Sequence, residues 1–147
     1  MTNTHTIHKY PYGVIGNCAY LALIKTDTSI DWLCWPRFDS SFIFGALVDQ
    51  KKGGRFAILP ENEIKEQKQS YLQNTNVLTT TIHTEQGAYR VTDFAPRFSQ
   101  YERYYKPLML VRKVEPIEGH PRVRVICRPT GEYGEVQPEG VFGSNHI

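Results

Sequence analysis

Residues 77–94 read Val-Leu-Thr-Thr-Thr-Ile-His-Thr-Glu-Gln-Gly-Ala-Tyr-Arg-Val-Thr-Asp-Phe, and this stretch decides the fold class. Its first part is rich in β-branched residues, which favour extended backbone. Residues 85–87 then supply a turn whose glycine tolerates a positive φ, and residues 88–94 return as a second strand. The stretch therefore predicts a β-hairpin.

The same alternation continues on both sides of this hairpin. Residues 122–128 alternate between apolar and arginine side chains, which predicts a strand with Val123, Val125 and Cys127 on one face. Other strands are expected at 19–25, 29–35, 53–59, 69–72 and 108–114, with turns at 26–28 and around Pro116, Gly119 and Pro121.

The remaining segments add little helix. A helical turn is expected at 42–48, where the preceding serines offer an N-cap, and short extended pieces are expected at 131–136 and 140–143. The sequence thus predicts a single all-β domain over residues 1–147, an antiparallel β-sandwich of about eight strands. A sandwich that stops at Ile147 would leave a strand edge or an apolar face uncovered, as in the first part of a larger sandwich.

The composition is that of an ordinary globular domain. The chain has 147 residues, of which 40% are hydrophobic and 22% charged, and its net charge is +2. So small a charge, from dispersed basic residues, argues against nucleic acid or an anionic membrane as a partner. No apolar run approaches the roughly 20 residues of a membrane span, and the N-terminus lacks a signal-peptide pattern. We therefore expect a cytoplasmic protein.

The sequence offers no pattern for a metal or a cofactor. Its five histidines are scattered, and Cys18, Cys34 and Cys127 show no Cys-x-x-Cys spacing. An odd number of cysteines in apolar surroundings is typical of free, buried thiols in a reducing compartment. Phosphate loops, dinucleotide fingerprints and serine-nucleophile elbows are lacking as well. We expect neither a metal site nor a cofactor.

Candidate site residues gather in residues 29–40, Ser-Ile-Asp-Trp-Leu-Cys-Trp-Pro-Arg-Phe-Asp-Ser, which contain both tryptophans of the chain. Burying such residues together is costly unless each polar group finds a partner. Because Pro36 ends ladder pairing and turns the chain out of the sheet, Trp35 is favoured for an exposed role.

Arg37 is the most suggestive residue of this stretch. It lies between Pro36 and Phe38, so its guanidinium is well placed for a bidentate contact with a carboxylate. Three partners are open: Asp39, Asp93, or a carboxylate that lies outside these 147 residues.

Residues 93–99 repeat the ending of 31–39, since both segments close on Pro-Arg-Phe. The repeat is either a coincidence of strand-end chemistry or a sign that Arg37 and Arg97 lie at the same rim of the sandwich. The candidates for substrate binding or domain contact are Trp35, Arg37, Phe38, Asp39 and Arg97.

A series of short motifs runs through almost the whole chain. They are Gly-Val-Ile-Gly-Asn-Cys (13–18), Ser-Ile-Asp-Trp-Leu-Cys (29–34), Pro-Arg-Phe-Asp-Ser (36–40), Gly-Gly-Arg-Phe (53–56), Tyr-Leu (71–72), Asn-Thr-Asn-Val-Leu-Thr-Thr (74–80), Val-Thr-Asp-Phe-Ala-Pro (91–96), Leu-Val-Arg-Lys-Val (110–114), Arg-Pro (128–129) and Tyr-Gly (133–134). In this order and spacing they resemble bacterial and archaeal glycoside hydrolase family 15 proteins, the glucoamylase, glucodextranase and trehalase-like enzymes. Two departures are Asn17 in place of an acidic residue and Phe42 in place of a proline.

The resemblance implies an N-terminal β-sandwich that precedes an (α/α)6 barrel carrying two catalytic glutamates, and this barrel is absent from the 147 residues. It implies that the parent protein hydrolyses α-glucosidic bonds with inversion, using water and no cofactor. We expect the chain alone to be non-catalytic, to support the barrel and to contribute the loop 35–40 to the rim of its pocket.

Two alternatives remain open. One is a free-standing carbohydrate-binding sandwich that presents an exposed aromatic platform among Trp35, Tyr101, Tyr104 and Tyr105, and the other is an oligomerisation module with an apolar exposed face.

An inverting pair of carboxyl groups lies roughly 6.5–9.5 Å apart, and nothing in the spacing of the aspartates indicates such a pair. Structural roles are therefore favoured for Asp31, Asp39 and Asp93.

Overall fold

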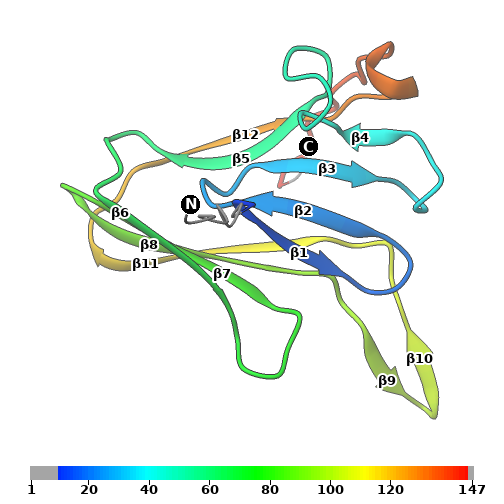
Figure 1. The fold of residues 1–147 in the computed structure, drawn as a ribbon, viewed down its shortest axis with the longest axis horizontal. Coiled ribbons are helices and arrows are strands. Elements are labelled where there is room, and N and C mark those ends of the chain that lie inside the picture. The colour runs from blue at the N-terminus through cyan, green and yellow to red at the C-terminus, as the bar shows by residue number, and fades with distance from the viewer. Residues whose placement is uncertain (1–9, 146–147) are drawn as a thin grey trace, which may run out of the picture.

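The computed structural model describes residues 10–145 and contains two antiparallel β-sheets, with a two-stranded hairpin projecting at one end (Figure 1). The larger sheet has the order β1-β2-β3-β5-β12, with β4 paired to β3, and the smaller sheet has the order β11-β8-β7-β6. The strands are β1 (Tyr12–Gly16), β2 (Leu21–Lys25), β3 (Ile30–Cys34), β4 (Phe42–Phe44), β5 (Arg55–Pro60), β6 (Glu66–Tyr71), β7 (Leu78–Thr84), β8 (Gly87–Phe94), β9 (Phe98–Gln100), β10 (Arg103–Tyr105), β11 (Val111–Gly119) and β12 (Val123–Arg128). The predicted all-β, antiparallel fold is confirmed.

The central hairpin forms as the sequence predicts. β7 and β8 pair from Leu78 opposite Asp93 to Thr84 opposite Gly87, and Gly87 has a φ of 143° that only glycine adopts readily. The expected hairpin around residues 26–28 is also present, as β2 and β3. Eight of the strands fall where they were predicted, and β1, β4, β9 and β10 were not foreseen.

The helical turn predicted at 42–48 is wrong. Residues 42–44 form β4, which pairs with β3, and Phe42 and Phe44 are buried. Burying two alternate aromatic side chains against the larger sheet outweighs the serine cap that suggested a helix. Gly45 then ends the strand, with no room for a Cβ because the Phe42 ring lies in the way.

The predicted break at Pro116 is also wrong, because β11 runs through it to Gly119. Pro116 lies opposite Tyr89, next to a register shift between Pro116 and Glu118. A proline is tolerated at a bulge or on an edge strand, and β11 is the outermost strand of the smaller sheet.

The C-terminal part is less extended than predicted. Gly131 and Val136 form an isolated bridge around a 3-10 turn, Glu132–Gly134, which is the one helical element among residues 10–145. Residues 140–143 form no strand.

Two groups of buried side chains fill the space between the sheets. The first surrounds Tyr20 and includes Ile15, Ile30 and Leu33. The second consists of Ile58, Ile82, Tyr89 and Val91. The first group takes alternate positions of β2, Ala22 and Ile24, but also Ile15 and Phe44 from strands that were not predicted. The alternation therefore identifies only part of the core.

Only one of the three cysteines is buried as expected. All three are free; Cys34 is buried, whereas Cys18 and Cys127 are exposed. Cys127 lies on β12, which pairs only with β5 among the described residues, and its neighbour Val125 is 60% exposed. The predicted inner face of this strand is covered only near Val123, which packs against the second core group.

The uncovered edges that the sequence predicts are present. Within residues 10–145, β11 and β12 each pair with a single neighbouring strand, and Val114 and Ile117 on β11 are exposed. An apolar hollow of about 320 Å³, lined by Phe44, Phe56 and Leu110 among others, reaches Cys127 on β12.

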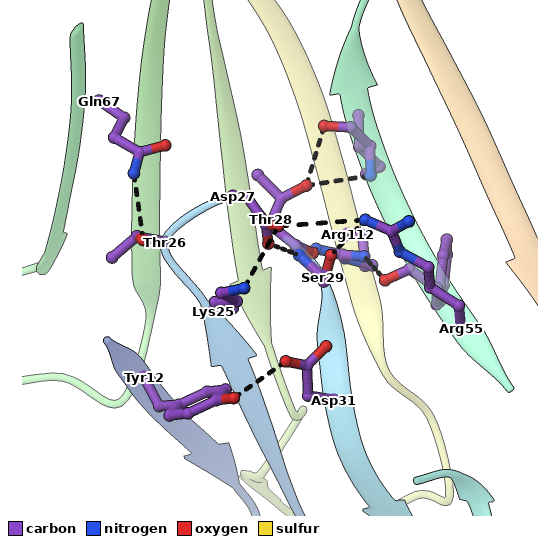
Figure 2. A network of polar contacts seen from close by, with 12 residues as sticks. Tyr12, Lys25, Thr26, Asp27, Thr28, Ser29, Asp31, Arg55, Gln67 and Arg112 are labelled. Atoms are coloured by element: carbon purple, nitrogen blue, oxygen red, sulfur yellow. Dashed lines mark hydrogen bonds and ion pairs between the residues drawn. The ribbon is translucent and has the colours of Figure 1, made fainter. Parts of the chain in front are cut away.

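A buried ion pair within the smaller sheet carries an arginine that also contacts the larger sheet. Arg112 on β11 lies opposite Asp93 on β8, its Nε donates to Asp93 Oδ1 at 2.8 Å, and both side chains are almost fully buried. The same guanidinium donates to the backbone oxygen of Thr28, in the turn between β2 and β3 (Figure 2). It also donates to the backbone oxygen of Phe56 on β5 of the larger sheet. Burial raises the pKa of Asp93, and the hydrogen bonds and charge of Arg112 oppose that rise.

Because of Tyr20, we expect the stability of the fold to vary with pH in the alkaline range. Its ring is fully buried, its hydroxyl donates to the backbone oxygen of Met109, and burial raises its pKa to about 12 from the model-compound value of 10.0. The folded chain therefore keeps a proton that the unfolded chain releases, so stability falls as pH rises from about 10 to about 12, by up to about 3 kcal/mol.

Urea unfolding at about pH 9 and about pH 11.5 checks this expectation. The Tyr20→Phe variant should lose less stability between the two pH values than the unchanged chain does. An equal loss in both proteins would contradict the role assigned to Tyr20.

Candidate functional site

Trp35 lies at the end of β3 and is less exposed than expected. It precedes a cis peptide bond to Pro36. Its ring packs on Tyr20 with centroids 4.8 Å apart, and it lies against the first core group. Trp35 is half-buried and lines the apolar hollow with Phe44 and Leu110, so it does not form an open sugar platform.

Arg37 and Asp39 form an ion pair in the loop that follows. Arg37 Nε lies 3.0 Å from Asp39 Oδ1, with side chains 73% and 71% exposed. Of the two partners considered within the chain, Arg37 pairs with Asp39, while Asp93 is paired with Arg112. Phe38 between them is 54% exposed. The loop thus presents a charged pair and an aromatic ring to the surroundings.

Arg97 lies on the other side of Cys18 from this loop. Its Nη1 donates to Cys18 Sγ at 3.2 Å, and its guanidinium lies 5.5 Å from the centre of the Tyr104 ring. Cys18 also lines a shallow hollow with Arg37 and Phe38. The two Pro-Arg-Phe segments therefore lie at the same end of the sandwich, as one of the two readings of their repeat proposed.

A larger hollow of about 560 Å³ lies at this end, and we call it the rim hollow. Three segments line it: 16–18 between β1 and β2, 75–77 between β6 and β7, and 94–98 between β8 and β9. Of the predicted site residues it contains Arg97 only, while Arg37, Phe38 and Asp39 line the neighbouring hollow.

Hydrogen bonds hold the walls of the rim hollow together. Buried Asn17 donates to the backbone oxygens of Pro96 (3.1 Å) and Pro107 (2.9 Å), and its Oδ1 accepts from Ala19 N. Asn76 Nδ2 donates to Gly16 O at 2.7 Å. Asn17 and Asn76 were missed as site residues; both lie in the motifs quoted above, but nothing in those motifs shows which backbone groups they bind.

Tyr71 adds a bond between the sheets near the same end. Its hydroxyl donates to Val14 O at 2.8 Å and accepts from Val14 N at 2.7 Å. It ties the end of β6 to the outer edge of β1.

The β9–β10 hairpin carries exposed aromatic side chains beside the rim hollow. Tyr101 and Tyr104 are 83% and 72% exposed, and Phe98 stacks on Tyr105 with centroids 5.5 Å apart. Figure 1 shows the hairpin standing away from the two sheets. The predicted platform of Trp35 with the three tyrosines is not assembled, since Trp35 packs on Tyr20 in the core.

The carboxylates of the larger sheet have structural partners. Asp31 accepts a hydrogen bond from the Tyr12 hydroxyl at 3.0 Å, and burial, followed by this hydrogen bond, raises the pKa of Tyr12 (Figure 2). Asp27 lies 4.0 Å from both Lys25 and Arg55. Among residues 10–145, no group of three or more histidine, cysteine, aspartate or glutamate side chains is arranged to hold a metal ion.

Comparison with known proteins identifies the family. A family model described as "Trehalase-like, N-terminal" matches residues 3–141. The chain belongs to this family. The resemblance to the N-terminal domain of family 15-like proteins is thereby confirmed at the level of the trehalase-like N-terminal domain.

Full-length relatives are much longer than the matched region. The chain is 34% identical to a trehalase of Thermoplasma volcanium over 139 residues, which are 90% of the chain and 22% of that protein. It is 42% identical to trehalase 1 of Sulfolobus acidocaldarius over 86 residues, 58% of the chain and 15% of that protein. It is 28% identical to a trehalase of Mycolicibacterium smegmatis over 85% of the chain and 20% of that protein. The chain thus spans about a fifth of these relatives.

No solved structure gives a significant match. Within the described residues, no helix has the length and hydrophobicity that a membrane crossing requires.

Proposed function

We propose that this chain is the non-catalytic N-terminal domain of a family 15-like glycoside hydrolase, and that the parent protein cleaves α-glucosidic bonds with inversion in the cytoplasm. The observation that carries the proposal is the family match over residues 3–141, a region that makes up about a fifth of each trehalase compared. The structure supports it, because Asp31 and Asp93 are held by Tyr12 and Arg112 and are not free to act as acid and base. The two catalytic carboxyl groups would come from an (α/α)6 barrel.

The surface proposed to contact the barrel is the end of the sandwich formed by the loop 35–40, residues 17–19 and the β9–β10 hairpin. It combines exposed aromatic side chains with the exposed Arg37 guanidinium, and aromatic and arginine side chains are enriched in protein interfaces. A two-stranded hairpin is marginally stable alone, so contact with a further domain would hold β9 and β10 in place.

The test is a chimera assayed for trehalose hydrolysis. The chain replaces the matching region of the Thermoplasma volcanium trehalase, and the trehalase without that region serves as the comparison. We expect hydrolysis by the chimera and none by the truncated trehalase. Full activity of the truncated trehalase would contradict a supporting role for this domain.

Arg37 tests the position of the contact surface. In the chimera, Arg37→Ala should lower kcat/KM by about tenfold, the effect of losing one charged hydrogen bond to a partner. In the chain alone the exposed pair contributes less than about 1 kcal/mol, so its unfolding should change little. Arg90→Ala, which changes an exposed arginine on β8, is the control and should leave both measurements unchanged.

A further inference from the structure

We propose that the rim hollow is itself a binding site for a neutral sugar, and that it holds one pyranose ring of an α-glucoside. The choice of an α-glucoside rests on the proposed function, whereas the site rests on the geometry of residues 16–18, 75–77 and 94–98.

The size and rigidity of the rim hollow suit a small ligand. Its volume of about 560 Å³ lies within the range of about 300–1,000 Å³ that small-molecule sites occupy. Asn17 fixes the 94–98 wall through Pro96 O, and Asn76 fixes the 75–77 wall to Gly16 O. Because these bonds form without a ligand, binding would cost little ordering of the walls.

The chemistry of the walls indicates a sugar. Phe94 and Phe98 supply aromatic surface for the apolar C–H face of a pyranose ring. Asn76 Oδ1 accepts no hydrogen bond within the described residues, and Arg97 donates only through Nη1, to Cys18. An acceptor and spare donors on two segments of the lining match the needs of neighbouring hydroxyl groups, which both donate and accept.

The charge of the lining favours a neutral ligand over an anion. Arg97 is the one charged residue in the lining, and it lies over the Tyr104 ring. Phosphate sites in proteins combine several charged or backbone donors on one group, and the rim hollow offers one guanidinium.

Cysteine protection provides the first test, using the unchanged chain. Cys18 lines the rim hollow, Cys127 lines the separate apolar hollow, and both are exposed. Trehalose or maltose, added to about 50 mM against a weak site with a Kd of about 1 mM, should slow the alkylation of Cys18 by iodoacetamide several-fold. The rate at Cys127 should not change. Equal rates at Cys18 with and without sugar would overturn the proposal.

A matched pair of variants provides the second test, read by chemical-shift changes of the backbone amides. The affinity for sugar is read from the shift changes at residues 16–18, 75–77 and 94–98. Phe98→Ala should lower this affinity by about tenfold, because it removes a central aromatic contact. Tyr101→Ala removes an 83% exposed aromatic side chain of the same hairpin that does not line the rim hollow, and should leave affinity unchanged.

The outcomes separate this site from the proposed function. Equal weakening in the two variants, or shifts outside the three segments, would overturn the sugar site. Binding of inorganic phosphate at the same residues, with no response to trehalose, would overturn the proposal that the ligand is a neutral sugar. If the chimera hydrolyses trehalose but no sugar binds at the rim hollow, the proposed function is supported and only the proposed sugar site is wrong.

Discussion

Replacing Arg112 with methionine is expected to lower the free energy of unfolding by about 3–5 kcal/mol, because it leaves the Asp93 carboxylate buried without a cation. It also removes the donors to Thr28 O and Phe56 O, which join the smaller sheet to the larger one. Domains of this size have a total stability of about 5–15 kcal/mol, so the variant should be only marginally folded. Urea unfolding followed by tryptophan fluorescence measures the loss.

The pH dependence of this variant distinguishes a lost ion pair from lost packing. Without Arg112, nothing offsets the burial that raises the pKa of Asp93. A raised folded-state pKa gives stability that is present at low pH and lost as pH rises, so the deficit should be smaller near pH 4 than near pH 7. A deficit that is independent of pH would assign the effect to packing.

Lys113→Met is the matched control on the same strand. Lys113 pairs with Glu115 at 2.7 Å, but the two side chains are 61% and 42% exposed. Exposed pairs contribute at most about 1 kcal/mol, so this variant should unfold close to the unchanged chain. A comparable loss in the two variants would show that β11 tolerates no such replacement and that the buried ion pair is not special.

The second large effect is expected at Asn17. Asn17→Ala removes two donors and one acceptor from a buried site and leaves Pro96 O, Pro107 O and Ala19 N unpaired, at a cost of about 2–4 kcal/mol. Asn62→Ala is the control, because the Asn62 side chain makes no hydrogen bond within the described residues. Urea unfolding of both variants measures the difference.

Asn17→Asp then tests why an amide is needed at this position. An aspartate can still accept from Ala19 N, but at neutral pH it has no proton for the two proline carbonyls. We expect a loss near pH 7 at least as large as that of Asn17→Ala, and a smaller loss near pH 4, where the protonated carboxyl can donate once. An unchanged stability at pH 7 would show that the 95–98 segment adapts to the carboxylate.

The sequence predicts the parts of the fold that depend on local pattern. Alternation along 78–84 and 87–94 specifies both the hairpin and its core-facing side chains, since a strand buried on one face must alternate. It fails at 42–44, because three residues are too few to show a period, and what decides their conformation is pairing with β3. The hairpin of β9 and β10 was missed because each strand has three residues and all of them are exposed, so no alternation of buried and exposed side chains marks it.

The candidate site could be predicted only in part. Residue type and neighbours suggested Arg37, Asp39 and Arg97, whereas their placement near Cys18 is known only from the structure. Asn17 and Asn76 donate hydrogen bonds to backbone oxygens of residues far away in the sequence. Every residue has such an oxygen, so the sequence does not show which ones will accept these bonds. Where the family pattern leads us to expect an acid, this chain has an amide that donates to two carbonyl oxygens.

The hydroxyl of Tyr71 has a consequence for how this protein behaves at high concentration. β1 is the outermost strand of the larger sheet, and the outward-facing N–H and C=O of Val14 would otherwise be open to an incoming strand from another molecule. One phenol group occupies both, so β1 offers a poor template for sheet-to-sheet aggregation. At the opposite edge of the larger sheet, no side chain among the described residues covers the free backbone groups of β12 in this way, so that edge stays open to pairing with another strand.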